Sequence, residues 1–305
     1  MWHDDLNRLL VLPRAQQYAA LQALRAQHTA PQAEEWNVIF GPASLYEALT
    51  HLPAFQGIYQ ANRAVLRHWL EARRAWHIIE VGGGNGALWR GFFRGDEQGQ
   101  FTLIDPTPEP HTVISTLLPV GVTFHSVKAP IQEADLPEAD VVVCSLVLHH
   151  IAGVDAQERL RHGLTGPGKR EVLARLVTAL QARQGLGILN EADVYHDLSL
   201  PPGDPLLVER LMDSYVRRGA TMVAAGLAQP DLEESMRQRW ELILHHWFIS
   251  QIDKAQVSAT ARDVYELDAP RWLQLLSHVG ARVQSHRYTD DWHAVVQYVF
   301  SPTGE

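Results

Sequence analysis

The chain has 305 residues, of which 46% are hydrophobic and 20% are charged, so it is long enough to bury a sizeable core and has the composition of a globular protein. Its net charge of −9 argues against a nucleic-acid partner, because phosphate binding needs clustered Lys and Arg side chains and the sequence has no such cluster. The single cysteine, Cys144, excludes an intramolecular disulfide. The sequence shows no signal peptide and no apolar run of the ~18 residues that a membrane span requires. We therefore expect a cytoplasmic protein with no membrane partner.

The first part of the chain, residues 1–72, has the pattern of short helices. Apolar residues recur at helical spacing, as they do at Leu6, Leu9 and Leu10, and prolines divide the region into pieces. We therefore expect residues 1–72 to form an N-terminal helical cap.

Residues 73–194 alternate between short apolar runs and amphipathic helical patterns. The runs that read as strands are 77–81, 101–105, 122–127, 140–148 and 186–194. Such alternation predicts an α/β fold, a Rossmann-like doubly wound sheet that is mostly parallel and has helices on both faces. Ligands of these sheets bind beyond the carboxyl ends of the strands.

The alternation stops in residues 195–267, where helical patterns predict an insertion that extends the cap. In residues 268–305 it returns. A helix is expected to begin at Asp268, a suitable N-cap, and to end at Gly280. Two further strands then predict an antiparallel C-terminal hairpin that completes the core sheet.

The most informative motif is the glycine turn that follows the first strand, Glu80-Val-Gly82-Gly83-Gly84-Asn85-Gly86, with a helical pattern after it at 87–93. Glycines remove Cβ atoms from the turn, so a ligand can approach the backbone closely. The spacing resembles the acid-x-Gly-x-Gly-x-Gly motif of class I S-adenosylmethionine (SAM)-dependent methyltransferases. Glu80 is the acid, and Gly82, Gly84 and Gly86 are the three glycines.

The same glycines also satisfy the dinucleotide pattern G-x-G-x-x-G/A, ending at Ala87, with Asp105 at the offset of a ribose-binding acid. Three features favour SAM over a nicotinamide or flavin cofactor. An acid at the strand end is characteristic of the methyltransferase motif, more than 70 residues precede the strand, and residues 140–151 resemble the fourth strand of methyltransferases and its loop.

The resemblance implies how SAM is bound. The amides of the glycine turn, near the start of the following helix, would meet the methionine carboxylate. Glu80 would accept from the ammonium group, and Asp105 would accept both ribose hydroxyls. Gln132 is expected to contact adenine, and Glu133 is the alternative for this contact. Ser145 and Leu146 are expected to contact the methionine part of SAM. Arg63 is expected to contact the carboxylate of SAM, and a surface salt bridge is the alternative role for Arg63.

Methyl transfer to a hydroxyl or an ammonium group needs alignment and a base. His149 follows the fourth strand at the ligand-binding edge, and a neutral imidazole suits proton removal near neutral pH; a hydrogen-bonded structural role is the alternative. The next candidates follow the fifth strand or lie in the insertion: Glu191, Asp193, Tyr195, His196 and His246. No metal is expected, because no zinc-binding His or Cys spacing is present.

These observations favour a methyltransferase that acts on a small molecule, an intermediate of secondary metabolism, since a non-basic chain with a helical cap suits an enclosed pocket. A second hypothesis keeps the fold and changes the reaction: a SAM cyclase that forms azetidine-2-carboxylate and methylthioadenosine. A scaffold without chemistry is a third hypothesis, disfavoured by the intact glycine turn and Asp105. A homodimer is compatible with the sequence.

Overall fold

The computed structural model describes residues 4–5, 8–9, 11–27, 45–71, 73, 75–151, 167–194, 200–201, 203–211, 213–214, 218–219, 221–243 and 266–304. The chain divides into two compact units. The first comprises Met1–Gln56, Asp193–Arg262 and Asp290–Ala294, and the second comprises Gly57–Ala192, Asp263–Thr289 and Val295–Glu305. The region expected to form the N-terminal cap, 1–72, is thus shared between the two units.

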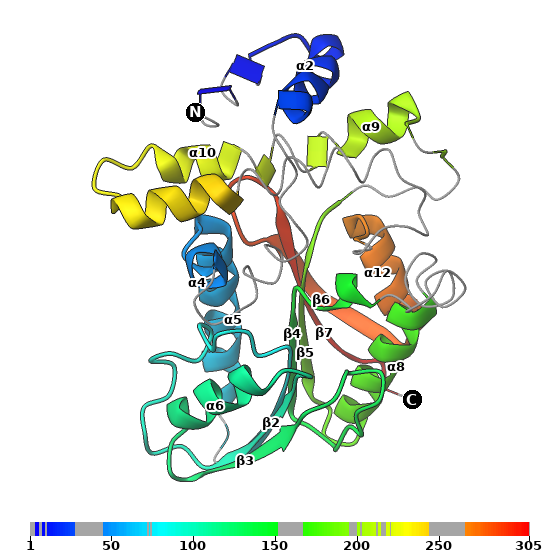
Figure 1. The fold of residues 1–305 in the computed structure, drawn as a ribbon. Helices are drawn as coiled ribbons and strands as arrows, with labels where there is room; N and C mark the ends of the chain where they lie inside the picture. The colour runs from blue at the N-terminus through cyan, green and yellow to red at the C-terminus, as the bar shows by residue number, and fades with distance from the viewer. Residues whose placement is uncertain are drawn as a thin grey trace. The chain divides into compact units, whose positions relative to one another are not determined.

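The first unit is mainly helical in its described part (Figure 1). Its labelled helices are α2 (Arg14–Gln27), α4 (Leu45–Thr50), α9 (Pro205–Leu211) and α10 (Thr221–Leu227). Residues 234–243 are also helical, and there the buried Trp240 donates its indole N–H to the carbonyl of Ala48 at 2.8 Å. Trp240 therefore joins two helices that lie far apart in the sequence.

The second unit is built on a seven-stranded sheet (Figure 1). The strands are β1 (Trp76–Val81), β2 (Gly99–Ile104), β3 (Val122–Val127), β4 (Val141–Ser145), β5 (Leu186–Ala192), β6 (Ala281–Tyr288) and β7 (Val295–Pro302). Their order is β3-β2-β1-β4-β5-β7-β6, in which β1 to β5 are parallel and β7 runs antiparallel between β5 and β6. The predicted Rossmann-like sheet with an antiparallel C-terminal hairpin is confirmed.

Helices cover both faces of this sheet. Helices α5 (Pro53–Leu70, which begins in the first unit) and α6 (Pro108–Leu117) lie on one face, and α8 (Pro167–Gln181) and α12 (Ala269–His278) lie on the other (Figure 1). Because successive strand residues point to opposite faces, the central strands β1, β4 and β5 each contribute to two hydrophobic clusters. Ile78, Val143 and Ile188 pack in the first, and Ile79, Cys144 and Leu189 pack in the second. The single cysteine is thus a core residue.

Helix α12 has the two ends that the sequence indicated. The Asp268 carboxylate accepts a hydrogen bond from the amide of Arg271 at 3.1 Å, which satisfies one of the free N–H groups of the first turn. At the other end Gly280 has a φ of 75°, where glycine carries no steric penalty.

The helix expected at 87–93 is wrong, because this segment forms a series of turns. Arg63 of α5 donates its guanidinium N–H groups to the carbonyls of Ala87, Leu88 and Arg90, at 2.8 to 2.9 Å. A helix would need these carbonyls for its own hydrogen bonds. The apolar spacing that resembled a helix instead buries Trp89 against the sheet.

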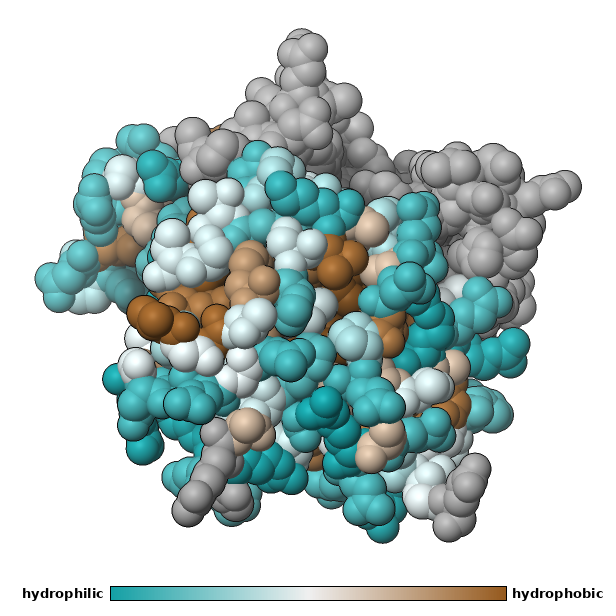
Figure 2. All heavy atoms as spheres, turned by 90° about the horizontal axis from the view of Figure 1, so that it is seen from below, coloured by the Kyte–Doolittle hydropathy of each residue, from teal (hydrophilic) through white to brown (hydrophobic). Residues whose placement is uncertain are grey.

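The surface is mixed in character. Hydrophilic residues cover most of the face shown in Figure 2, and hydrophobic residues gather in a band across it. In the described part of the chain, no helix has the length and apolar character needed to cross a membrane.

Candidate functional site

The glycine turn follows β1 and lies at the carboxyl edge of the sheet. Gly82, Gly84 and Gly86 have φ values of 77°, 52° and 70°, which side chains with a Cβ rarely adopt. A Cβ on Gly82 would lie 2.3 Å from Cγ2 of Val147. Gly82 therefore lets the turn pack directly against the segment that follows β4.

Glu80 is buried beneath this turn. One of its carboxyl oxygens, Oε2, accepts a hydrogen bond from the indole N–H of Trp89 at 2.7 Å. Burial raises the pKa of Glu80 well above its ordinary value, and the Trp89 hydrogen bond offsets part of this rise. Trp89 in turn stacks on Phe93 and meets Phe101 edge to face. Oxygen Oε1 remains for the predicted contact with the SAM ammonium group, which stays a prediction.

Asp105 follows β2 and binds the glycine turn. Its Oδ2 accepts from the amide of Gly83 at 2.9 Å, and its Oδ1 accepts from the amide and the hydroxyl of Thr107 at 2.9 and 2.6 Å. A carboxylate has about four acceptor positions, so Asp105 has one left, on Oδ2. The predicted contact with both ribose hydroxyls would therefore require the Thr107 hydroxyl to turn away.

The other predicted cofactor residues lie at three separate places in the second unit. Arg63 donates three hydrogen bonds to backbone carbonyls of the segment that follows the glycine turn. Burial lowers the pKa of its guanidinium group. Gln132 is exposed, and its carbonyl accepts from Arg175 at 2.9 Å. Ser145 and Leu146 lie together at the end of β4, where Leu146 has a φ of 56° and donates its amide to the carbonyl of Asn190 at 2.8 Å. The contacts of Arg63, Gln132, Ser145 and Leu146 with SAM remain predictions.

His149 lies beside a buried carboxylate. It belongs to the short 3-10 helix η1 (Leu148–His150), and its Nδ1 is 2.8 Å from Oε2 of Glu191 at the end of β5. The other oxygen of Glu191 accepts from the amides of Val147 and Leu148 at 3.1 and 2.7 Å. One carboxylate thus fixes both the imidazole ring and the backbone of the turn that carries it.

The environment of Glu191 changes its acidity. Burial raises its pKa from 4.5 to about 7, although the hydrogen bonds from Leu148 and Val147 and the charges of His150 and Lys169 oppose the change. Lys169 is fully buried on α8, where burial lowers its pKa to about 8. Glu266, which also interacts with Lys169, has its pKa raised by burial to about 7. Neither Lys169 nor Glu266 was expected from the sequence, because only the packing of α8 and of the segment before α12 brings these side chains close to Glu191.

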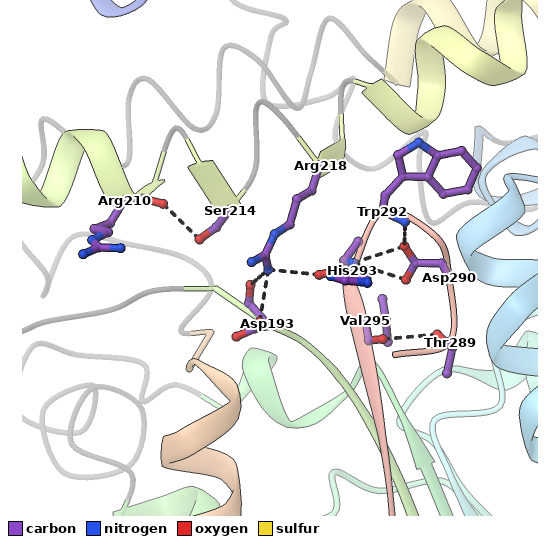
Figure 3. A network of polar contacts seen from close by, with 10 residues as sticks. Asp193, Arg210, Ser214, Arg218, Thr289, Asp290, Trp292, His293 and Val295 are labelled. Carbon is purple, nitrogen blue, oxygen red and sulfur yellow. Dashed lines mark hydrogen bonds and ion pairs between the residues drawn. The ribbon is translucent and has the colours of Figure 1, made fainter. Parts of the chain in front are cut away.

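Asp193 lies in the first unit and is held by an ion pair there. Arg218 donates to the carbonyl and the carboxylate of Asp193, both at 3.1 Å, and to the carbonyl of His293 at 2.9 Å, as Figure 3 shows. Asp290 accepts from the amides of Trp292 and Ala294 in the same loop. The carboxylate of Asp193 is thus held by Arg218, and its role as a catalytic candidate stays a prediction.

Three of the catalytic candidates, Tyr195, His196 and His246, lie outside the described residues. Within the described ranges, no group of three His, Cys, Asp or Glu side chains is arranged to hold a metal ion.

Three polar residues that the sequence analysis did not select are buried near Ser145: Asn62 on α5, Asn190 on β5 and Gln297 on β7. The sequence does contain a pattern that marks two of these residues as unusual. Asn190 and Gln297 interrupt apolar strands, where an amide side chain is costly unless it is hydrogen-bonded.

Comparisons with known proteins find matches among solved structures alone. No family model matches the chain, and no curated protein matches it. Among solved structures it is similar to N-methyltransferase NodS from Bradyrhizobium japonicum WM9 in complex with S-adenosyl-l-homocysteine, with 12% identity, a TM-score of 0.47, and coverage of 88% of this chain and 96% of that one. A 1,6-didemethyltoxoflavin-N1-methyltransferase from Burkholderia thailandensis has 14% identity and a TM-score of 0.47, with 96% and 92% covered. The mitomycin 7-O-methyltransferase MmcR has 13% identity and a TM-score of 0.44, with 97% and 70% covered.

The order and directions of the chain's own strands establish a Rossmann-like sheet, parallel from β1 to β5, with an antiparallel C-terminal hairpin.

The first testable expectation concerns Glu191. Its pKa in the folded state, about 7, lies above the ordinary value of 4.5, so its contribution to stability is fully present below about pH 4.5 and is lost as the pH rises toward 7. Glu191→Gln cannot ionise and can keep the contacts with Val147, Leu148 and His149. We expect wild type to lose stability relative to this variant between about pH 5 and pH 8, by on the order of 3 kcal/mol.

Thermal or urea unfolding of both proteins across this pH range measures the difference. Glu80 and Glu266 are present in both proteins, so their own titrations largely cancel. A difference that does not change with pH would show that Glu191 is already ionised at pH 5.

Proposed function

We propose that the protein is a SAM-dependent methyltransferase that acts on a small-molecule acceptor. The observation that carries this proposal is the sheet order β3-β2-β1-β4-β5-β7-β6 with the glycine turn directly after β1. A dinucleotide-binding sheet of the order 3-2-1-4-5-6 has no antiparallel strand inserted beside its fifth strand. The sheet therefore favours SAM over the nicotinamide alternative, although the glycine spacing suits both.

The residues at the carboxyl edge fit SAM. Asp105 keeps an acceptor position for a ribose hydroxyl, and Glu80 keeps one oxygen for a cationic group. Gly84 has a positive φ, Ser145 ends the neighbouring strand and Leu146 follows it. All these residues belong to the second unit. When bound, SAM supplies an electrophilic methyl group.

His149 is the base in this proposal. Glu191 holds Nδ1, so Nε2 is the ring nitrogen that would take the proton of a hydroxyl or ammonium acceptor, and the carboxylate would stabilise the imidazolium that results. Glu191 is a positioning residue, because it acts through His149. Tyr195 and His246 remain further candidates. Residues 1–72 and 195–267 are proposed to form the cap expected from the sequence, and the acceptor would be an intermediate of secondary metabolism.

The proposal is tested by incubating the protein with methyl-labelled SAM, alone and with a panel of phenols, catechols and amines, followed by mass spectrometry. We expect S-adenosylhomocysteine and a methylated acceptor only when an acceptor is present. Methylthioadenosine formed from SAM alone would overturn the proposal in favour of the cyclase hypothesis. Wild-type protein that does not bind SAM in calorimetry would overturn both.

A second expectation concerns Asp105. Asp105→Asn removes the charge that would receive a ribose hydroxyl, so we expect S-adenosylhomocysteine to bind about 10- to 100-fold more weakly. Thr107→Val is the matched variant: it removes the hydroxyl that occupies Oδ1, and this hydroxyl makes no cap hydrogen bond to α6. We expect Thr107→Val to bind at least as tightly as wild type.

Calorimetric titration measures both variants. If Asp105→Asn binds as tightly as wild type while remaining folded, Asp105 is a structural ligand of the glycine turn and not a cofactor residue.

A third expectation concerns His149. His149→Gln should lower kcat by about 10²- to 10⁴-fold with the acceptor identified in the panel, because the base is lost, and should leave the dissociation constant of S-adenosylhomocysteine unchanged. Quantifying the methylated product in a discontinuous assay gives kcat, and calorimetry gives the dissociation constant of S-adenosylhomocysteine. An unchanged kcat for a hydroxyl acceptor would assign His149 a structural role.

A further inference from the structure

A chain of buried amide side chains runs across the sheet and ends at Ser145. It begins with Arg287 on β6, whose Nε donates to Oε1 of Gln297 on β7 at 3.3 Å. The amide nitrogen of Gln297 donates to Oδ1 of Asn62 on α5 at 2.7 Å. The amide nitrogen of Asn62 then donates to Oγ of Ser145 on β4 at 3.2 Å. All four residues belong to the second unit.

Asn190 on β5 closes the network. Its amide nitrogen donates to Oδ1 of Asn62 at 3.0 Å and to Oγ of Ser145 at 2.9 Å, so both of its N–H groups are used. Its Oδ1 is buried and has no hydrogen-bond partner in the structure as described. Asn62 and Asn190 are fully buried, and Gln297 is 1% exposed.

The orientation of each amide follows from the one before it. An arginine side chain can only donate, so Arg287 assigns the oxygen of Gln297 to the side that faces it. The nitrogen of Gln297 then requires the oxygen of Asn62, and the nitrogen of Asn62 is left for Ser145. Reversing Asn190 would place its oxygen against the oxygen of Asn62. The direction of donation is therefore fixed from Arg287 to Ser145.

This direction determines the chemistry of the Ser145 hydroxyl. A hydroxyl has one hydrogen and about two acceptor positions, and the amides of Asn62 and Asn190 occupy both acceptor positions. Ser145 can then only donate, and in the described part of the chain no group accepts its hydrogen. Ser145 is only half-buried, so this hydrogen can reach a ligand.

The register places Ser145 beside the glycine turn. Cys144, the residue before it, pairs with Val81, the residue before Gly82, and Ser145 itself pairs with Asn190. The donor thus lies at the carboxyl edge of β4, next to the backbone that is proposed to receive the cofactor.

We propose that Asn62, Asn190 and Gln297 are positioning residues that make Ser145 an obligate hydrogen-bond donor to the carboxylate of the amino-acid part of the cofactor. The inference rests on the proposed function. A donor suits a carboxylate and opposes an ammonium group, which also donates. The network therefore gives the site a preference for ligands that carry the carboxylate over adenosyl thioethers that lack it.

The experiment reverses the network at one atom. Asn62→Asp keeps the oxygen that accepts from Asn190 and Gln297 and replaces the nitrogen that donates to Ser145 by a second oxygen. The Ser145 hydroxyl then donates inward to the carboxylate that this substitution introduces, and its hydrogen is lost to the ligand.

Two ligands report the result: S-adenosylhomocysteine and its decarboxylated analogue, which keeps the amine and lacks only the carboxylate. We expect Asn62→Asp to bind S-adenosylhomocysteine about 10- to 100-fold more weakly than wild type, and to bind the decarboxylated analogue within about 2-fold of wild type. Ser145→Ala should show the same pattern. In a Ser145→Ala background, Asn62→Asp should then have no further effect on the ratio of the two affinities.

The matched control is Gln181→Glu, which makes the same amide-to-carboxylate change at an exposed position at the end of α8 and should bind both ligands as wild type does. Equal weakening of both ligands by Asn62→Asp and by Ser145→Ala would assign the network a structural role and overturn the inference alone. If Asn62→Asp does not fold, Ser145→Ala decides by the same two titrations. Wild-type protein that binds neither ligand would overturn the proposed function, and the inference with it.

Discussion

The loops at the carboxyl edge of the sheet depend on the burial of three acids at strand ends. Glu80, Asp105 and Glu191 are 5%, 7% and 1% exposed, and a buried carboxyl group without hydrogen bonds is costly. Each acid is therefore paired with N–H groups of a neighbouring loop. Glu80 accepts a hydrogen bond from the indole N–H of Trp89, and Asp105 accepts one from the amide of Gly83. Glu191 accepts hydrogen bonds from two amides of the turn after β4. The acids organise the loops that a ligand would meet.

The sheet and its turn could be predicted because their signals are local. Runs of β-branched residues indicate buried strands, and the spacing of Gly82, Gly84 and Gly86 indicates a tight turn without Cβ atoms, which the structure forms with a positive φ at all three glycines. The ends of α12 at Asp268 and Gly280 were equally readable, because each cap depends on a residue within one turn of the helix.

The failures have a common physical cause, which is competition from residues distant in sequence. The segment 87–93 has helical spacing, yet Arg63 of α5 donates hydrogen bonds to its backbone carbonyls. No local pattern within the segment indicates that a donor from α5 will bind there. The amide network joins residues separated by 83, 128 and 235 positions, so it exists only once α5, β4, β5 and β7 are packed together. A sequence can mark Asn190 as an unusual strand residue, but the packed fold decides what it binds.

Strand β5 shows how one element can support two parts of the site. Asn190 and Glu191 are consecutive, so their side chains point to opposite faces of the sheet. Asn190 lies on the face of Ile188 and α5 and reaches Ser145, whereas Glu191 lies on the face of Leu189 and α8 and reaches His149. A shift of one residue in the pairing of β5 with β4 would exchange the two faces, and would separate Asn190 from Ser145 and Glu191 from His149. The proposed donor to the cofactor and the proposed base therefore depend on the same strand register, which the apolar residues on both faces of β5 hold in place.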